Sequence, residues 1–307
     1  MTEPKLSTLK KEILTKWHIA ARIEGIVEEA YKPKIKIVGD ESGKSSYTFG
    51  IIRNEKRFNR LDVAKKDELQ CNLCNTIKSA RDEPERNLFP GHHLMDFLVT
   101  INKFPIIEGF SLAITEKERP MFTTSNLNGV AQELDLFLKF ADETGYEIFR
   151  NSPGFGATIP NHEHTHLTTF RNCYELVGKK YGLDAAQKTT TEVSKDIMTI
   201  PDFPFAHLIF QRQDPDRIVS FLRNVHSEIS DKYPGRAIPH TISQGYDGIL
   251  VTIGKSYLEK SRGSGDVAGH IIIKTEDEFN DMNYEKCISE MDKILIRKNE
   301  LNLEKFI

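Results

Sequence analysis

Three histidines alternate with other residues in the stretch "NHEHTHL" at positions 161–167: His162, His164 and His166. Successive side chains of a β-strand point to opposite faces, so the three imidazoles share one face while Glu163 and Thr165 point away. An imidazole nitrogen can attack the α-phosphorus of a nucleotide and hold the nucleotidyl group as a phosphoramidate. The spacing therefore predicts a nucleophilic histidine. A three-histidine metal site and an ordinary strand of packed histidines are the alternatives.

The segment "NSPGFGAT" before the histidines has the residue types of a phosphate cradle. Gly154 and Gly156 permit close approach of the backbone to a ligand, and Asn151 and Ser152 carry short polar groups suited to phosphate oxygens. A nucleophilic imidazole must present a lone pair at one nitrogen, so its other nitrogen should donate to a fixed acceptor such as a backbone carbonyl. We therefore predict phosphorus chemistry for the segment and the histidines together.

The stretch "GATIPNHEHTH", with "NKFP" at 102–105 and "RNSPG" at 150–154, resembles the histidine-triad superfamily. It is most similar to the large two-half branch that contains galactose-1-phosphate uridylyltransferase, diadenosine tetraphosphate phosphorylase and GDP-hexose phosphorylases. The resemblance implies that His164 is the covalent nucleophile, with His162 and His166 beside it in the catalytic triad. It also implies a nucleotide- and phosphate-binding set: Asn102, Asn151, Ser152, Gly154 and Gly156.

His166, two residues after the expected nucleophile, departs from the pattern of the large branch. The resemblance implies glutamine there in most transferases and phosphorylases, and histidine in the small hydrolytic members and some phosphorylases. A protonatable histidine can donate to a leaving group or activate water, whereas glutamine only donates a hydrogen bond. Transfer to phosphate or a sugar phosphate and hydrolysis by water both stay open, and a nucleotide-binding protein without turnover is a third hypothesis.

The sequence "CNLC" places Cys71 and Cys74 at a metal-ligand spacing. In the uridylyltransferase branch, a cysteine pair joins two histidines on structural zinc, and the resemblance maps Cys71, Cys74 and His162 onto three of these ligands. The fourth ligand does not map: "ITEKERP" offers Glu118 or Arg119, and "FPGHHLMD" offers His92 or His93. Structural zinc and two buried thiols are the alternatives, while Cys173 and Cys287 are expected in the core.

Composition limits the class of protein and its partners. The chain has 307 residues, is 38% hydrophobic and carries 42 basic and 45 acidic side chains, for a net charge of −3. A core of good size is expected, and neither nucleic acid nor a membrane is an expected partner. The charged N-terminus lacks a signal-peptide core, which predicts a cytoplasmic protein. The expected partners are a nucleotide or nucleotide-sugar substrate, with phosphate or a sugar phosphate as acceptor.

The expected helices and strands, together with the resemblance, predict an α+β fold of the histidine-triad kind. It has an antiparallel sheet and flanking helices, duplicated in two halves. Residues 5–31 and 127–144 have helical apolar spacing, and residues 96–115 predict a hairpin. Strands are also expected at 146–151, 207–213, 249–254 and 268–275, with a closing helix at 276–298 and a polar linker at 178–198.

We expect the catalytic half at 1–190 and a phosphorylase-type second half at 191–307. The second half is expected to complete the substrate pocket or to form a homodimer surface. His240, in "IPHTIS", is expected to form a structural hydrogen bond, with an active-site role as the alternative, and His270 is expected in the core.

Overall fold

The computed structural model describes residues 8–23, 33–41, 48–54, 71–82, 87–88, 94, 96–102, 105–106, 109–124, 126–153, 159, 161–168, 191–210, 214–230, 238, 240–244, 248–255 and 270–307. Several residues named from the sequence lie outside these ranges: Gly154, Gly156, His92, His93 and Cys173.

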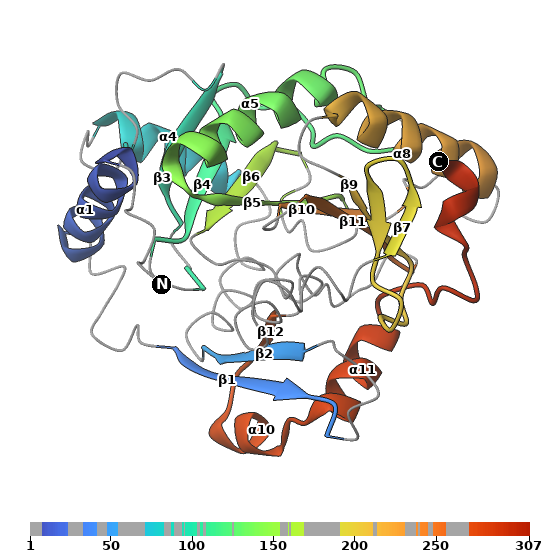
Figure 1. Ribbon diagram of the computed structural model, residues 1–307. Helices are drawn as coiled ribbons and strands as arrows, with labels where there is room; N and C mark the ends of the chain where they lie inside the picture. Colours follow the sequence, from blue (N-terminus) through green and yellow to red (C-terminus); the bar gives the residue numbers. More distant parts are fainter. Residues whose placement is uncertain are drawn as a thin grey trace.

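The centre of the molecule is a nine-stranded sheet in which every neighbouring pair is antiparallel (Figure 1). Its order is β3-β4-β6-β5-β10-β11-β9-β8-β7. The strands are β3 (Phe97–Ile101), β4 (Ser111–Thr115), β5 (Glu147–Asn151), β6 (His164–Thr168), β7 (Thr191–Ser194), β8 (Ile197–Thr199), β9 (His207–Phe210), β10 (His240–Gln244) and β11 (Ile249–Ile253).

The sheet contains the same arrangement twice. In chain order, β3 and β4 are followed by helix α5 (Val130–Thr144) and then by β5 and β6, while β8 and β9 are followed by helix α8 (Pro215–Ile229) and then by β10 and β11. Outward from the centre, β5, β6, β4 and β3 on one side correspond to β10, β11, β9 and β8 on the other. The two arrangements meet where β5 pairs with β10, so the two halves share one continuous sheet.

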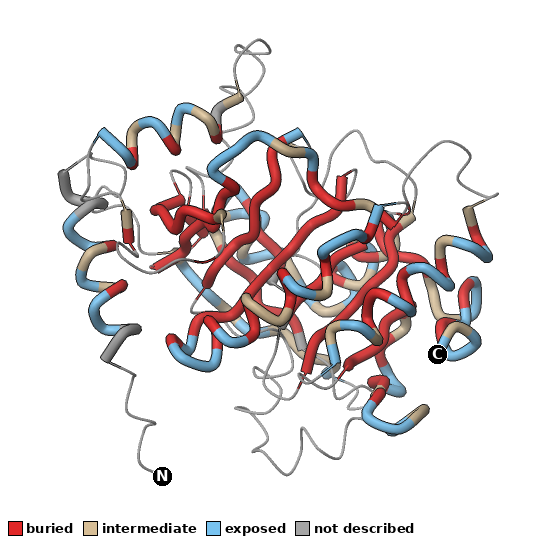
Figure 2. The backbone as a smooth tube through the Cα atoms, turned by 90° about the horizontal axis from the view of Figure 1, so that it is seen from above, coloured by how far each residue is buried: buried red, intermediate tan, exposed pale blue. Residues whose placement is uncertain are grey.

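Helices α5 and α8 pack on one face of the sheet, and α1 (Thr8–Ile23) packs beside α5 and β3 (Figure 1). The side chain of Asp214 caps α8 by accepting from the backbone NH of Arg217, and Gly145 ends α5 in a left-handed conformation with φ of 70°. The apolar stripes of these helices join the sheet in one core cluster that includes Trp17, Phe137 and Phe221. Buried strands and half-buried helices are visible in Figure 2.

The opposite face of the sheet is covered at its two ends. Helix α4 (Asn72–Asp82) packs on β3 and β4. A three-stranded sheet of β1 (Lys34–Gly39), β2 (Thr48–Arg53) and β12 (His270–Ile273) packs with α11 (Tyr284–Asp292) on β9 and β11. Helix α10 (Glu276–Asp281) contacts β2, and the 3-10 helix η3 (Leu303–Phe306) contacts α8.

The predicted α+β fold, with an antiparallel sheet and flanking helices in two halves, is confirmed. Local interpretations need correction. The polar stretch "SARDEPERN" at 79–87 predicts a solvated loop, but residues 79–82 belong to α4, because the apolar contacts of Ile77 and Ala80 continue the helix. Part of the expected linker forms the β7–β8 hairpin. The expected closing helix is broken between α10 and α11, where Asn283 caps the second helix.

Helix α8 and strand β10 were not anticipated. Cys287 is buried, as expected. No helix in the described part of the chain is long and apolar enough to cross a membrane.

The contact between Gly248 and β9 predicts a stability effect. A Cβ atom at Gly248 would lie 2.9 Å from Ile209 Cγ2 and closer still to the carbonyl oxygen of Phe210. Because that oxygen belongs to backbone paired with β11, it cannot move without disturbing the ladder. We expect Gly248→Ala to lower the free energy of unfolding by about 1–3 kcal/mol, measured by urea denaturation. Coinciding transitions for variant and wild type would contradict this view of the strand junction.

Candidate active site

His164 begins β6, and its ring has a defined tautomer. Its Nδ1 lies 2.8 Å from the backbone carbonyl oxygen of His162. A carbonyl oxygen only accepts hydrogen bonds, so Nδ1 carries the hydrogen and Nε2 presents a lone pair. His164 thus has the geometry that the sequence analysis required of a nucleophilic imidazole.

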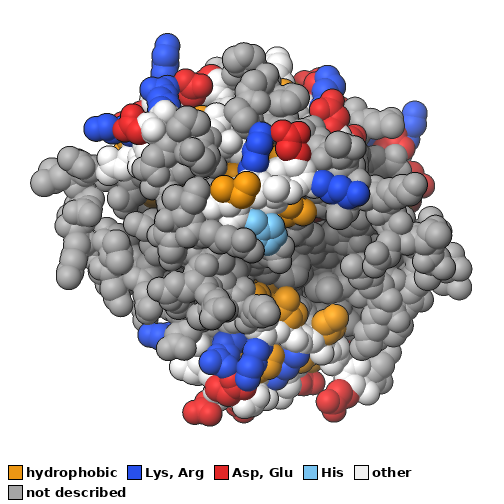
Figure 3. Space-filling model, turned by 90° about the vertical axis from the view of Figure 1, so that its left-hand side faces the viewer, with side chains coloured by type: hydrophobic (Ala, Val, Ile, Leu, Met, Phe, Trp, Pro, Cys, Tyr) orange, Lys and Arg blue, Asp and Glu red, His pale blue; other side chains and the backbone are white. Residues whose placement is uncertain are grey.

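His166 lies beside His164 on the same face of β6. The two ring centroids are 5.4 Å apart and the rings are nearly perpendicular. On its other side, His166 contacts the ring of Phe110 at 5.3 Å. The backbone of Asn102 donates to the carbonyl of Phe110, and strand alternation puts the Asn102 side chain on this same face. His166 itself is buried, and the side of the molecule shown in Figure 3 carries basic and acidic side chains near one another on its surface.

His162 contacts other residues than His164 and His166 do, and it has the opposite tautomer to His164. Its Nε2 donates to the carbonyl oxygen of Thr115 at 2.7 Å, which leaves Nδ1 with a lone pair. That lone pair faces the sulfurs of Cys71 and Cys74 at 3.2 and 3.4 Å. The three ligand atoms lie within 4.8 Å of one another, so this cluster could bind a metal ion.

The chemistry of the cluster fits a thiophilic metal. Burial and the neighbouring Cys71 raise the pKa of the Cys74 thiol to about 12, and a bound metal ion reverses this preference by holding the thiolate. The hydrogen bond from His162 to Thr115 is the outer contact that orients a metal-bound imidazole. Of the fourth-ligand candidates within the described residues, Glu118 lies beside the cluster: its Oε2 is 3.7 Å from Cys74 Sγ.

Glu163 points to the face opposite the histidines, into a network of buried charge. It pairs with Arg150 and Arg119, and both arginines also pair with Glu133 on α5. The Arg150 guanidinium is fully buried and lies 4.2 Å from the centroid of the Phe122 ring. Burial lowers the pKa of Arg150 to about 10, so the side chain stays charged at neutral pH. Sequence reasoning missed this network, although the alternation of β6 indicated that Glu163 points away from the histidines.

Asn151 and Ser152, adjacent in sequence, have different surroundings. Asn151 pairs with Thr241 on β10, and the β5–β6 register continued by two residues places it opposite His164 on the histidine face. Ser152 is used between the halves: its backbone NH donates to the carbonyl of His240 at 3.0 Å, and its Oγ accepts from the NH of His240 at 2.8 Å.

His240 lies on the helix-covered face, not on the histidine face. Its Nδ1 donates to the carbonyl of Ile238, and its ring lies 5.5 Å from the Phe122 ring. Burial lowers the pKa of His240 to about 4, so the ring is neutral at neutral pH. The expected structural role therefore suits this histidine better than an active-site role. Only the backbone of His270, in β12, is described.

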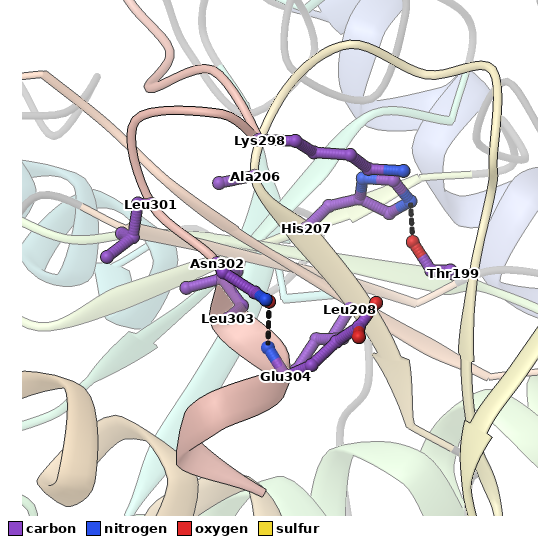
Figure 4. Close-up of a pocket in the computed structure, with 9 residues that line it drawn as sticks. All are labelled: Thr199, Ala206, His207, Leu208, Lys298, Leu301, Asn302, Leu303 and Glu304. Atoms are coloured by element: carbon purple, nitrogen blue, oxygen red, sulfur yellow. Dashed lines mark hydrogen bonds between the residues drawn. The ribbon is translucent and has the colours of Figure 1, made fainter.

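A separate cavity of about 210 Å³ lies between β9 and the C-terminal residues (Figure 4). It is lined by His207, Lys298 and Glu304, among others. The His207 ring is engaged at both nitrogens, because Nδ1 donates to Phe205 O and Nε2 accepts from Ile200 NH. Burial lowers its pKa to about 3. This cavity therefore contains no imidazole with an available lone pair, and His207 supports the fold.

Comparisons with known proteins find similarity in structure but not in sequence. No family model matches the chain, and no curated protein matches it. Yeast Ap4A phosphorylase Apa2 in complex with Ap4A superposes with a TM-score of 0.59 at 15% identity, over 95% of this chain and 97% of that chain. The complex of Apa2 with AMP gives 0.57 at 15% identity, over 95% of each chain. The expected likeness to the two-half phosphorylases is thus confirmed at the level of fold.

The buried charges behind β6 predict a large loss of stability on truncation. Arg150→Met leaves the carboxylates of Glu163 and Glu133 buried with only Arg119 to balance them. We expect a loss of about 3–5 kcal/mol in the free energy of unfolding, the usual effect of breaking a buried ion pair. Urea denaturation measures it. The control is Arg150→Met with Glu163→Gln, which removes one orphaned charge and should recover part of the loss. A double variant less stable than Arg150→Met would contradict the electrostatic account.

Proposed function

We propose that this protein is a nucleotide phosphorylase that cleaves a nucleoside polyphosphate or nucleotide sugar through a nucleotidyl-His164 intermediate. The observation that carries the proposal is the hydrogen bond from His164 Nδ1 to the carbonyl oxygen of His162, which leaves Nε2 with a lone pair. The fold of yeast Ap4A phosphorylase, matched over nearly its whole length, supports the same class of reaction. The neighbouring rings of His164 and His166 argue against a binding protein without turnover.

The reaction would proceed in two displacements. His164 Nε2 forms a bond to the α-phosphorus while the bond from that phosphorus to the bridging oxygen of the leaving group breaks. The imidazole becomes positively charged, and the carbonyl of His162 stabilises the hydrogen on Nδ1. An oxygen of inorganic phosphate then attacks the same phosphorus, and His164 leaves as a neutral imidazole. In this scheme Asn151, opposite His164, donates to a phosphate oxygen as charge develops.

His166 favours hydrolysis as the second candidate function. Its ring lies next to His164, within reach of groups at the same phosphorus. Protonated, it would donate to the leaving oxygen, and neutral, it would accept a proton from an attacking water. The choice of acceptor is then a competition between phosphate and water at one intermediate.

We also propose that Cys71, Cys74 and His162 hold a structural zinc ion, with Glu118 as the fourth ligand. Zinc prefers four ligands of the thiolate, imidazole and carboxylate kinds. The exposed Glu118 side chain already lies beside Cys74. When bound, the ion would supply structural cross-linking between α4 and the start of the histidine stretch. His162 would thus be a metal ligand, and the ion would fix the chain at the position next to Glu163.

Replacement of His164 tests the covalent mechanism. We expect His164→Ala to abolish turnover of Ap4A and to retain nucleotide binding, because the phosphates and the base are held by other groups. His166→Ala should retain activity reduced by about a hundred- to ten-thousand-fold, the usual contribution of a proton donor. Product masses with and without phosphate give the acceptor: phosphate-dependent release of a nucleoside diphosphate indicates phosphorolysis, and a monophosphate in phosphate-free buffer indicates hydrolysis.

The control for this test is His240→Ala, which alters a buried histidine on the opposite face of the sheet. Near-native turnover by His164→Ala would contradict the covalent mechanism. Loss of nucleotide binding together with loss of activity would instead assign His164 to substrate binding.

Metal content tests the zinc proposal. We expect about one zinc ion per chain in protein purified without chelator, and we expect Cys74→Ser to lose it. Removal of the ion should lower the melting temperature more than it changes the rate of the chemical step, because metal binding contributes to folding. Elemental analysis and thermal unfolding with and without chelator measure both effects. Cys287→Ser, a buried cysteine away from the cluster, is the control. Metal-free protein with two reactive thiols would favour the buried-thiol alternative.

A further inference from the structure

The continuous sheet places residues of the second half in line with the histidines. The residues paired across the strands form a row that runs from His166 on β6 through Phe149 on β5 to Ser243 on β10. A parallel row, two pairs along, contains Asn151, Thr241 and Thr252. Paired residues of antiparallel strands have their side chains on the same face, so these groups share the face of the histidines.

Apart from Phe149, this part of the face is polar, whereas its two flanks are apolar. On one side α4 packs on Leu112 and Ile114, and on the other the small sheet and α11 pack on Leu250 and Ile209. Between these clusters lie the hydroxyl and amide groups of β5, β10 and β11. We name this the polar strip: Asn151, Thr241, Ser243 and Thr252.

Two side chains in the polar strip have hydrogen-bonding capacity that the described part of the protein does not satisfy. Ser243 is 1% exposed and Asn151 is 4% exposed. Neither Ser243 Oγ nor Asn151 Oδ1 has a partner among the described residues. Thr241 and Thr252, by contrast, hydrogen-bond each other at 2.8 Å. Because leaving a buried polar group without a partner is unfavourable, Ser243 is suited to meet a ligand hydroxyl. Asn151 Oδ1 only accepts hydrogen bonds, so Asn151 would meet a phosphate through its NH2 group.

We infer that Ser243 binds a sugar hydroxyl of the leaving group, on the far side of the phosphates from the nucleotidyl group held by His164. The inference rests on the proposed function. Strands are about 4.8 Å apart, so Asn151 lies about 5 Å from the nucleophile's strand and Ser243 lies about 10 Å from it. Phosphates would occupy the first distance and the sugar the second.

The chemistry of the side chains fits this division. A hydroxyl both donates and accepts, as a sugar hydroxyl does, and no charged side chain belongs to the polar strip. The sugar is either the ribose of a nucleotide or a hexose. The second half of the chain would then select the leaving group, while the first half carries the nucleophile.

The test measures equilibrium binding with chemistry blocked. His164→Ala and the double variant His164→Ala with Ser243→Ala are titrated by calorimetry with Ap4A, with ADP-glucose and with AMP, which has no leaving-group sugar. Loss of one hydrogen bond predicts about a 3- to 10-fold weaker Kd for Ap4A, for ADP-glucose or for both, and an unchanged Kd for AMP. The Ap4A arm reports a ribose and the ADP-glucose arm a hexose. Ser111→Ala in the same background is the control, since Ser111 is equally buried but points to the helix face and donates to Gly109.

An unchanged Kd for both Ap4A and ADP-glucose would overturn the inference about Ser243. An equal loss for AMP would place Ser243 on the nucleotidyl side, and an equal loss in the Ser111→Ala control would assign the effect to stability; either result also overturns it. Failure of the proposed function gives a different result, because then His164→Ala would bind none of the three compounds or would still turn over Ap4A or ADP-glucose.

Discussion

The segment 162–168 carries histidines on one face and a carboxylate on the other, and the ion pairs of Glu163 fix which face is which. One face carries imidazoles, and the other carries a carboxylate that pairs with Arg150 and Arg119. A shift of one residue in register would move Glu163 to the histidine face and leave Arg150 buried without its partner. That arrangement would be far less stable than the observed one. The buried charges therefore specify where the histidines point, although none of them lies on the histidine face.

The second constraint is the pairing of β5 with β10. Ser152 and His240 extend this ladder by two hydrogen bonds beyond the strand ends, one through a side chain. Because β5 also carries Arg150 and Asn151, the same strand connects the second half to the charges behind β6 and to the face in front of it. A displacement of β5 relative to β10 would therefore move side chains on both faces of the sheet. The two halves are therefore joined through one strand pair into a single sheet.

Features that depend on local pattern were predictable, and features that depend on long-range pairing were not. The hairpin of β3 and β4 follows from two apolar runs separated by breakers, and α5 follows from helical spacing with Gly145 at its end. Asp214, Pro215 and the apolar spacing after them indicate helix α8, although it was not predicted. The Arg150 network could not be foreseen, because its ion-pair partners lie up to 44 positions apart on separate elements, at Arg119, Glu133 and Glu163. Likewise, the place of Ser243 depends on the β5–β10 pairing, which no short motif encodes.

The tautomer of His164 supports a nucleophilic role only together with its surroundings. His207 and His240 make the same hydrogen bond, from Nδ1 to the carbonyl two residues earlier, so this contact is a local preference of histidine near the start of a strand. In His207 the second nitrogen is occupied by the NH of Ile200, and His240 lies on the helix-covered face beside Phe122. His164 combines the same tautomer with a second histidine and a polar row on its own face. The face of the sheet, decided by the charges on the other side, therefore distinguishes His164 from His240. His207 shares the face of His164, and what sets it apart is the hydrogen bond from the NH of Ile200 to its Nε2.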